Sequence, residues 1–540
     1  MTLPFKRADL VVAILCVASV FPFLGAREID GVRERRLAGT AADVDLHGHW
    51  LLPNLRGHPR FLKPPYADWL AVASMRLVGH GEFGFRLPFA LAGLGMIAVA
   101  WALGRRLVND DVGRLAALIL ASSVWFIGEC HSACQDVYLG CFAGAALLIW
   151  WRWQETAQPR SGALWGFWLW ATAACLIKGP VALAIIGIPV ALELWQARRG
   201  RLAITMRPWW GLLFVVAIAA AWPLAVWMQV PDFPQRLAAD MKHSLVRDEP
   251  DAKWSYFNHL VNWPWMTFPW TLLGVSALAL PLMRRTLPDW PRLRFAWLWL
   301  IGNFVFFCTW GMQPKHYLLP VMPALAVIEA ALCLRLVEAL RAPEANRRAF
   351  AAAVALTLTL VGLAIGAAGM LHSHGGANVG LAVALGITVA LPALVALIWL
   401  RSRPERWLAL LVAAGLLGTG VYSGGVWPAL SRQQTLASFG RAIAARVPAG
   451  EPVWFTETKD SLPFHAQRDL RPLDPRGISD YSLVLEKLGN GWLLMARWRF
   501  EAASRTVGGR VTLEVAVEQH PGPKAKSDDL LLVRFLTRGQ

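Results

Sequence analysis

The sequence contains few charged residues for its length. Charged side chains make up only 16% of the 540 residues, whereas hydrophobic ones make up 56%. A soluble globular chain carries about 25% charged residues, so this deficit excludes an ordinary soluble protein. Acids are the scarcer kind, and the net charge is +17. The basic residues fall in short clusters between apolar segments, which is typical of loops at a membrane surface and argues against a nucleic-acid partner.

Cysteine is also scarce, with 7 residues in the whole chain. Most lie within apolar segments, where a thiol usually packs as a small hydrophobe. Only Cys130 and Cys134 fall in a predicted external loop, with His131 between them. Two alternatives stay open for this loop: a disulfide between the cysteines, or a metal site that includes the histidine. Three potential ligands fall short of the four that a structural zinc site needs.

Long apolar segments, by contrast, are abundant, and a helix needs roughly 20 such residues to cross the hydrocarbon core. The 29 tryptophans fit the same environment, since indole favours the membrane–water interface. We predict about thirteen transmembrane helices, near residues 8–26, 86–104, 113–128, 137–151, 163–177, 179–196, 208–229, 263–283, 295–311, 317–334, 350–371, 378–400 and 407–426. The first segment also has features of a signal peptide, because Lys6 and Arg7 precede it. We favour an uncleaved anchor, because cleavage would leave Asp30 close to the new N-terminus.

The arginine clusters indicate an orientation. They alternate with arginine-poor connections such as 372–378, and they fall on one side if the N-terminus is cytoplasmic. The main clusters lie in the connections at 105–114, 198–207, 284–294, 335–348 and 401–406. Cytoplasmic loops carry an excess of Lys and Arg. The pattern therefore predicts a cytoplasmic N-terminus and, after an odd number of spans, an external C-terminus.

Three polar segments interrupt the series of spans, at 27–85, 230–262 and 427–540. The first contains amphipathic pieces at 30–37 and 67–77, and we predict that all three lie outside. In the tail, helical periodicity covers 434–447, and strand patterns cover 482–486, 492–498, 511–517 and 529–536. We therefore predict an all-α polytopic membrane domain over 1–426, followed by a small α/β domain over 427–540.

Five ionisable residues are predicted at the outer ends of the spans or in the outer loops. Two are acids and three are cations: Asp30, Asp136, Lys63, Lys178 and Lys315. Such a set suits an anionic ligand with an acid–base group beside it. The alternative is that they are interface charges reaching to water, or ion pairs that hold helices together. Large ordered segments on one face favour chemistry at the interface, whereas transporters usually bind their substrates near the bilayer midplane.

Motifs at His58–Trp69, Lys315–Ala326 and Asn262–Trp270 resemble those of one family, the GT-C type polyprenyl-phosphate-sugar-dependent membrane glycosyltransferases. This family includes the lipid A aminoarabinose transferases and the protein O-mannosyltransferases. The segment His58–Trp69 resembles its Phe-x-Lys-Pro-Pro-x-x-Tyr-Trp motif, and Lys315–Ala326 is similar to its Lys-x-x-Tyr-Ile-Leu-Pro-x-x-Pro-Ala-Leu element. The aromatic stretch Asn262–Trp270 looks like the one that enters the family's eighth span. Lys178-Gly-Pro and the isolated Asp136 also fall where the family has them, so the motifs occur in the family's order.

The resemblance implies an inverting glycosyltransferase of the bacterial inner membrane, whose donor is a sugar on polyprenyl (undecaprenyl) phosphate. Its acceptor would be lipid A, another glycolipid or a protein, reached from the periplasmic side. Asp30 would match the acid of the family's Asp-Glu-x-Arg-Tyr motif and, with Asp136, form the catalytic set. Lys63 would contact the carrier phosphate, and Arg247 would be a second phosphate ligand or simply a solvated loop charge. Three further residues complete the predicted substrate-binding set: Lys178, Lys315 and Tyr317.

The sequence departs from the family at three places. The second acid and the tyrosine are missing after Asp30, Gly48-His-Trp50 stands where Gly-Asp-Trp is common, and Leu62 replaces an acid found in some relatives. For these reasons no metal is assigned, and dependence on a divalent cation stays open. Three other functions also stay open: a protein O-glycosyltransferase, a transporter or flippase for lipid-linked sugars, and a non-catalytic assembly protein. A transporter would carry charges deep in several spans and an internal repeat, and the sequence shows few such charges and no clear repeat.

Overall fold

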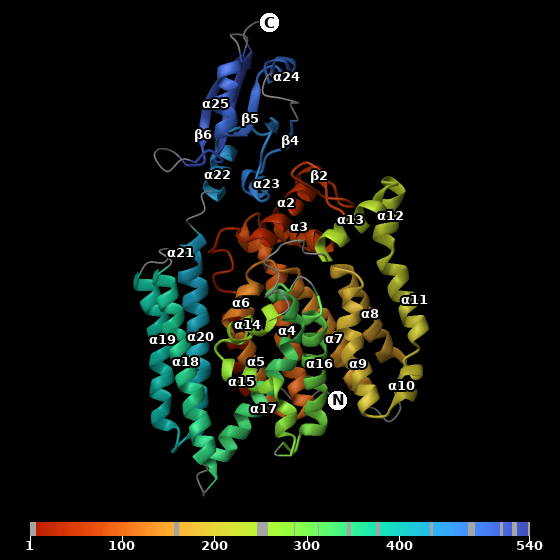
Figure 1. The fold of residues 1–540 in the computed structure, drawn as a ribbon, viewed down its shortest axis with the longest axis vertical. Coiled ribbons are helices and arrows are strands. Elements are labelled where there is room, and N and C mark those ends of the chain that lie inside the picture. Colours follow the sequence, from red (N-terminus) through yellow and green to blue (C-terminus); the bar gives the residue numbers. More distant parts are fainter. Residues whose placement is uncertain are drawn as a thin grey trace. The chain divides into compact units, whose positions relative to one another are not determined.

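The computed structural model describes residues 7–155, 161–245, 257–285, 287–310, 313–342, 347–373, 379–431, 436–473, 481–507, 511–520 and 526–537. The chain divides into two compact units (Figure 1). The first unit comprises Met1–Ala26, Leu62–Pro64 and Arg86–Leu430, which hold most of the apolar helices. The second comprises Arg27–Phe61, Pro65–Phe85 and Ser431–Gln540. The first long polar segment therefore groups mostly with the tail, with only Lys63 and its two neighbours in the helical unit.

The first unit is built from helices. In chain order they are α1 (Arg7–Val20), α4 (Glu82–Leu107), α5 (Asp110–Ala121), α6 (Val124–Cys130), α7 (Gln135–Gln154), α8 (Ser161–Lys178), α9 (Val181–Gln196), α10 (Gly200–Thr205), α11 (Pro208–Ala219), α12 (Ala221–Gln229), α13 (Phe233–Leu245), α14 (Asn258–Met266), α15 (Thr271–Leu278), η2 (Leu280–Met283), α16 (Trp290–Cys308), η3 (Lys315–Val321), α17 (Met322–Arg341), α18 (Arg347–Ser373), α19 (Val379–Trp399), α20 (Pro404–Val421), η4 (Tyr422–Val426) and α21 (Trp427–Ser431). Figure 1 shows α18, α19 and α20 running side by side.

Six helical stretches in the described residues are long and apolar enough to cross a membrane. They are Glu82–Leu107, Pro208–Gln229, Lys315–Arg341, Arg347–Met370, Val379–Trp399 and Pro404–Ser431. The pair α5 and α6, bent by 68°, makes a seventh if it counts as one span. The prediction of a mostly helical chain with several membrane spans is confirmed, and the number thirteen stays a prediction.

The segment 263–283 is not one continuous helix, contrary to the sequence prediction. It forms the end of α14, then α15 and the short η2. Pro264, Pro269 and Pro281 fall within this segment. Proline has no N–H to donate, and its ring crowds the preceding turn, so three prolines in one apolar stretch favour short helices over a single span.

Small residues let neighbouring helices approach closely. A Cβ added at Gly113 on α5 would lie 2.6 Å from the backbone oxygen of Trp101 on α4. On α7, a Cβ at Gly140 would lie 2.7 Å from the Cε of Met96 on α4 and 3.4 Å from the Cα of Pro320 on η3. Close backbone approach through small residues is common between membrane helices. Gly140 thus lies where α7 contacts both α4 and η3.

The second unit combines helices with a small mixed sheet. Its elements are α2 (Val32–His47), β1 (Asn54–Leu55), β2 (His58–Pro59), α3 (Tyr66–Val78), α22 (Leu436–Arg446), β3 (Val453–Phe455), α23 (Leu462–Ala466), β4 (Leu470–Pro472), α24 (Tyr481–Leu488), β5 (Gly491–Ala496), α25 (Arg497–Thr506), β6 (Val511–Glu518) and β7 (Leu530–Thr537). The sheet has the order β4-β3-β5-β7-β6, with parallel pairs among the first three strands and antiparallel pairs among the last three. Leu494 packs into one hydrophobic cluster and Leu493 into another, so apolar residues cover both faces.

The tail agrees with most of the sequence predictions. The helix at 434–447 and the strands at 492–498, 511–517 and 529–536 are confirmed, with small shifts at their ends. The strand at 482–486 is wrong, because this segment is the helix α24. Leu485 and Leu488 pack into the same cluster while Leu483 is 60% exposed, a helical spacing that five residues did not reveal.

Candidate functional site

Asp136 and Lys178 form a buried ion pair in the helical unit. Asp136 is the second residue of α7, and Lys178 is the last of α8. The Nζ of Lys178 lies 2.5 Å from Oδ1 of Asp136. An acid at a helix N-terminus and a cation at a C-terminus both interact favourably with the helix dipoles. Gly179 follows with a φ of 70°, a left-handed conformation that turns the chain into α9 and that glycine adopts without strain.

The short helix η3 brings an imidazole and a phenol to the same pair. The Nε2 of His316 lies 3.8 Å from Oδ2 of Asp136. The ring centroid of Tyr317 lies 4.0 Å from the Nζ of Lys178, a cation–π contact. Asp136 therefore has Lys178 on one carboxylate oxygen and His316 near the other.

Lys63 reaches the same place from the segment Leu62–Pro64. Its Nζ donates a hydrogen bond to Oε1 of Gln135, at 3.0 Å. Gln135 directly precedes Asp136 on α7, so the start of this helix connects Lys63 to the ion pair. The structure thus brings together four of the predicted site residues: Lys63, Asp136, Lys178 and Tyr317.

Among the described residues, the predicted cation Lys315 makes no hydrogen bond or ion pair with this network. Lys315 opens η3 and is exposed. No salt bridge joins it to another residue of the described ranges. Arg247 lies outside the residues that the structure describes.

Asp30 belongs to the second unit and stands just before α2. Its carboxylate accepts a hydrogen bond from the Gly31 N–H and lies 3.4 Å from Nη2 of Arg35. Its backbone N–H donates to Oε2 of Glu34, at 2.9 Å, and the same oxygen binds Nη2 of Arg27 at 2.7 Å. Glu34 thus reaches back to the start of the helix, as the acid of a capping box does. This bond fixes the backbone from which the Asp30 carboxylate projects.

Gln135 and His316 contact predicted site residues but were not predicted themselves. Both are sequence neighbours of predicted residues: Gln135 precedes Asp136, and His316 lies between Lys315 and Tyr317. That adjacency was the only available signal, because their contacts depend on how η3 packs against α7.

The cysteine loop forms neither predicted arrangement. Cys130 and Cys134 are both buried, and no disulfide joins them. The Nε2 of His131 bonds the backbone oxygen of Val20 at 2.7 Å. Among the described residues, the one group of side chains spaced to hold a metal is Asp43, His47 and His49, in the second unit.

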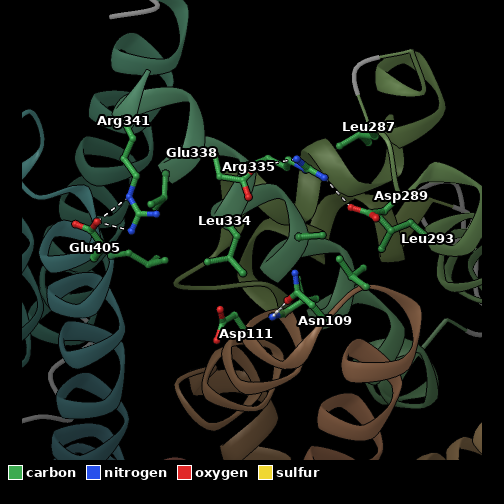
Figure 2. Close-up of a pocket in the computed structure, with 15 residues that line it drawn as sticks. Asn109, Asp111, Leu287, Asp289, Leu293, Leu334, Arg335, Glu338, Arg341 and Glu405 are labelled. Carbon is green, nitrogen blue, oxygen red and sulfur yellow. Dashed lines mark hydrogen bonds and ion pairs between the residues drawn. The ribbon is translucent and has the colours of Figure 1, made fainter. Parts of the chain in front are cut away.

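A separate cavity of about 310 Å³ lies at the opposite end of α17 from η3 (Figure 2). Its arginines are already matched to carboxylates: Arg335 lies 2.7 Å from Asp289, and Arg341 donates to Glu405 at 2.7 Å. Twenty helical residues span about 30 Å, so this cavity is far from the Asp136 network. It lies among the arginine-rich connections predicted to face the cytoplasm, and its paired charges favour a structural role.

The chain is similar in sequence to known sugar transferases. The family model described as dolichyl-phosphate-mannose-protein mannosyltransferase matches residues 62–227, which include Lys63, Asp136 and Lys178. A curated relative from Shewanella sediminis, undecaprenyl phosphate-alpha-4-amino-4-deoxy-L-arabinose arabinosyl transferase, is 26% identical over 324 residues. The match covers 57% of this chain and 56% of the relative, so it spans little more than half of each protein.

Solved structures extend the likeness to the whole chain. The crystal structure of ArnT from Cupriavidus metallidurans in the apo state superposes with a TM-score of 0.78 at 20% identity, covering 97% of both chains. The same protein bound to undecaprenyl phosphate gives 0.77 at 19% identity, again over 97% of both. The chain therefore has the ArnT fold, and the resemblance inferred from the motifs is confirmed.

Proposed function

We propose that this chain is an inner-membrane glycosyltransferase that moves a sugar from polyprenyl phosphate to an acceptor on the periplasmic side. The observation that carries the proposal is the contact network of Lys63, Asp136, Lys178 and Tyr317. Residues from distant parts of the sequence meet there, in a fold that ArnT uses with undecaprenyl phosphate bound. Undecaprenyl phosphate as carrier, and lipid A or another glycolipid as acceptor, are inferred from the relatives and the motifs.

The donor chemistry explains why cations are needed. As the glycosidic bond breaks, negative charge grows on the leaving phosphate, and fixed cations stabilise such charge. Lys63 would supply this contact. Its bond to the neutral Gln135 amide orients the ammonium group and does not itself cancel the charge. Lys315, exposed at the start of η3, and Arg247 are proposed as further phosphate contacts.

Asp136 takes a positioning role in this mechanism. Its carboxylate is buried and lies within hydrogen-bonding distance of Lys178, so a proton acceptor at this point would first have to break the ion pair. Held in place, the pair fixes the end of α8 and presents Lys178 to the ring of Tyr317. Asp136 would then affect the phosphate site indirectly, through the position of Lys178.

Asp30 is the proposed general base. If the acceptor is a hydroxyl, Asp30 would remove its proton; a phosphate acceptor is already anionic, and Asp30 would then orient it. For a hydroxyl acceptor, Asp30→Asn should lower the transfer rate by about 10²–10⁴-fold, the usual contribution of a general base. The measurement is transfer from undecaprenyl-phosphate-linked sugar to purified acceptor, followed by mass spectrometry. Asp45→Asn, an acid of the same unit paired with Arg76, is the matched control. Full activity of a folded Asp30→Asn variant on a hydroxyl acceptor would remove the base from the mechanism.

The runner-up is a protein O-glycosyltransferase, which the name of the matching family model supports. The same assay distinguishes the two functions. Mass spectrometry shows whether lipid A or a protein acceptor has gained the mass of the sugar. A transporter or an assembly protein would transfer sugar to neither.

The proposed topology has about thirteen spans, a cytoplasmic N-terminus and a periplasmic tail. Alkaline phosphatase is active only outside the cytoplasm, so fusions report the side of each position. We expect an active fusion after residue 537 and an inactive one within the arginine-rich connection at 198–207. The reverse result would overturn the orientation and, with it, the periplasmic acceptor.

A further inference from the structure

Three side chains of the second unit place potential metal ligands close together. The ligand atoms of Asp43, His47 and His49 all lie within 4.8 Å of one another. One oxygen of Asp43 lies 3.0 Å from Nδ1 of His47, and the other lies 3.0 Å from Nδ1 of His49. Two imidazole nitrogens with a carboxylate oxygen are a ligand set that zinc commonly takes, with a fourth position left to water.

The end of α2 creates this arrangement. Asp43 and His47 are four residues apart and therefore share one face of the helix. Gly48 then caps the helix in the left-handed conformation, with a φ of 71° and its N–H bonded to the oxygen of Val44. The chain changes direction at Gly48, and His49 therefore lies beside the carboxylate of Asp43. A side chain at Gly48 would strain the turn that makes the third ligand available.

A second layer of contacts holds the ligands in orientation. The Nε2 of His47 lies 2.8 Å from Oδ1 of Asp469, which directly precedes β4. Arg471 in turn donates to the other oxygen of Asp469 at 2.7 Å. Metal-binding histidines usually bond a carboxylate or carbonyl through the ring nitrogen that does not face the metal. His47 has that pattern, with Asp43 at one nitrogen and Asp469 at the other.

The carboxylate of Asp43 is positioned as well. The backbone N–H of Asn54 donates to its Oδ2 at 2.6 Å. The side-chain amide of Asn54 lies 2.9 Å from Nδ1 of His49. Binding of a metal at that nitrogen would replace this amide contact.

We propose that Asp43, His47 and His49 bind a zinc ion, through one carboxylate oxygen and the two Nδ1 atoms. Zinc–nitrogen bonds of about 2.0–2.1 Å in a tetrahedron separate the ligand atoms by about 3.3 Å. The two separations of 3.0 Å run to different oxygens of Asp43, so rotation of the carboxylate and of the two rings would bring both nitrogens to this distance from one oxygen.

The proposed site is accessible and joins two parts of the unit. All three ligands line a cavity of about 350 Å³, together with Asp469 and Arg56, so the fourth position is open to water. Through Asp469, the ion would connect the end of α2 to β4, and hence the first polar segment to the C-terminal sheet. His49 occupies the position where the Asp of Gly-Asp-Trp is common, so this departure supplies one of the ligands. The proposal is independent of sugar transfer.

The test is zinc binding to the full-length protein in mild detergent, purified with a tag that contains no histidine and stripped with a chelator. Titration with zinc chloride in a calorimeter should show one ion per chain in the wild type. His49→Ala, which removes a half-exposed ligand, should weaken binding at least tenfold. Asp469→Asn should weaken it by about 10–100-fold, as loss of an outer partner does, while all three ligands remain. Cobalt should give the intense visible absorption of a tetrahedral site in the wild type and not in His49→Ala.

The matched control is His80→Ala. His80 lies 3.4 Å from Asp45, so it is another histidine–aspartate pair of the same unit, outside the proposed ligand set. This variant should bind zinc as the wild type does. The proposal is overturned if the folded wild type binds no zinc, or if both His49→Ala and Asp469→Asn bind it with unchanged affinity.

Discussion

The Lys63→Ala variant should transfer sugar at least a hundredfold more slowly than the wild type while remaining folded. Lys63 is the proposed contact for the carrier phosphate, which gains charge as the glycosidic bond breaks. Removing one fixed donor to a developing anion costs about 10²–10³ in rate in well-studied enzymes. Lys63 donates a hydrogen bond to the Gln135 amide at the start of α7, and the substitution removes the positive charge that this bond positions. The measurement is single-turnover transfer with undecaprenyl-phosphate-linked sugar.

The control for this prediction is Lys63→Arg. It retains the positive charge in the same segment and should recover most of the activity, since the phosphate contact needs a cation above all. If Lys63→Ala is as active as the wild type, the carrier phosphate binds elsewhere. If Lys63→Arg is as inactive as Lys63→Ala, the shape and reach of the lysine ammonium group matter more than its charge.

The second large effect is expected on stability. Asp136→Ala leaves Lys178 without its buried partner; the two side chains are only 4% and 13% exposed. Breaking a buried ion pair from one side costs about 3–5 kcal/mol, because an uncompensated charge stays buried. Thermal unfolding in detergent should therefore show a clearly lower midpoint.

Asp232→Ala is the matched control for Asp136→Ala. Asp232 pairs with Arg236 on α13, but both side chains are more than half exposed, and such pairs contribute about 0–1 kcal/mol. A double variant, Asp136→Ala with Lys178→Met, should regain part of the lost stability, because no buried charge remains. Equal midpoints for Asp136→Ala and Asp232→Ala would mean that water reaches the Asp136–Lys178 pair.

Much of the helical architecture could be predicted because apolar length alone specifies a membrane helix. Apolar length does not show where prolines interrupt a helix. Pro264, Pro269 and Pro281 fall within one predicted span, which forms short helices instead. The strand predicted at 482–486 failed for a different reason. Its pattern of alternating residues is too short to distinguish a strand from the buried face of α24, which only the packing of Leu485 reveals.

The site could be predicted in part. The motifs identified Lys63, Asp136, Lys178 and Tyr317, which the structure joins by direct contacts. The arrangement itself was not predictable, because it depends on how η3 packs against α7. The proposed zinc ligands were missed for a similar reason. The sequence showed His49 only as a departure from a family motif, and its approach to Asp43 needs the left-handed turn at Gly48.

The most direct test of the central claim is native mass spectrometry of the wild-type protein in mild detergent with added undecaprenyl phosphate. The account predicts one bound carrier per chain, retained when the detergent is removed in the gas phase and reduced in Lys63→Ala. A folded wild-type protein that binds no carrier would contradict the account and would favour an assembly role over glycosyl transfer.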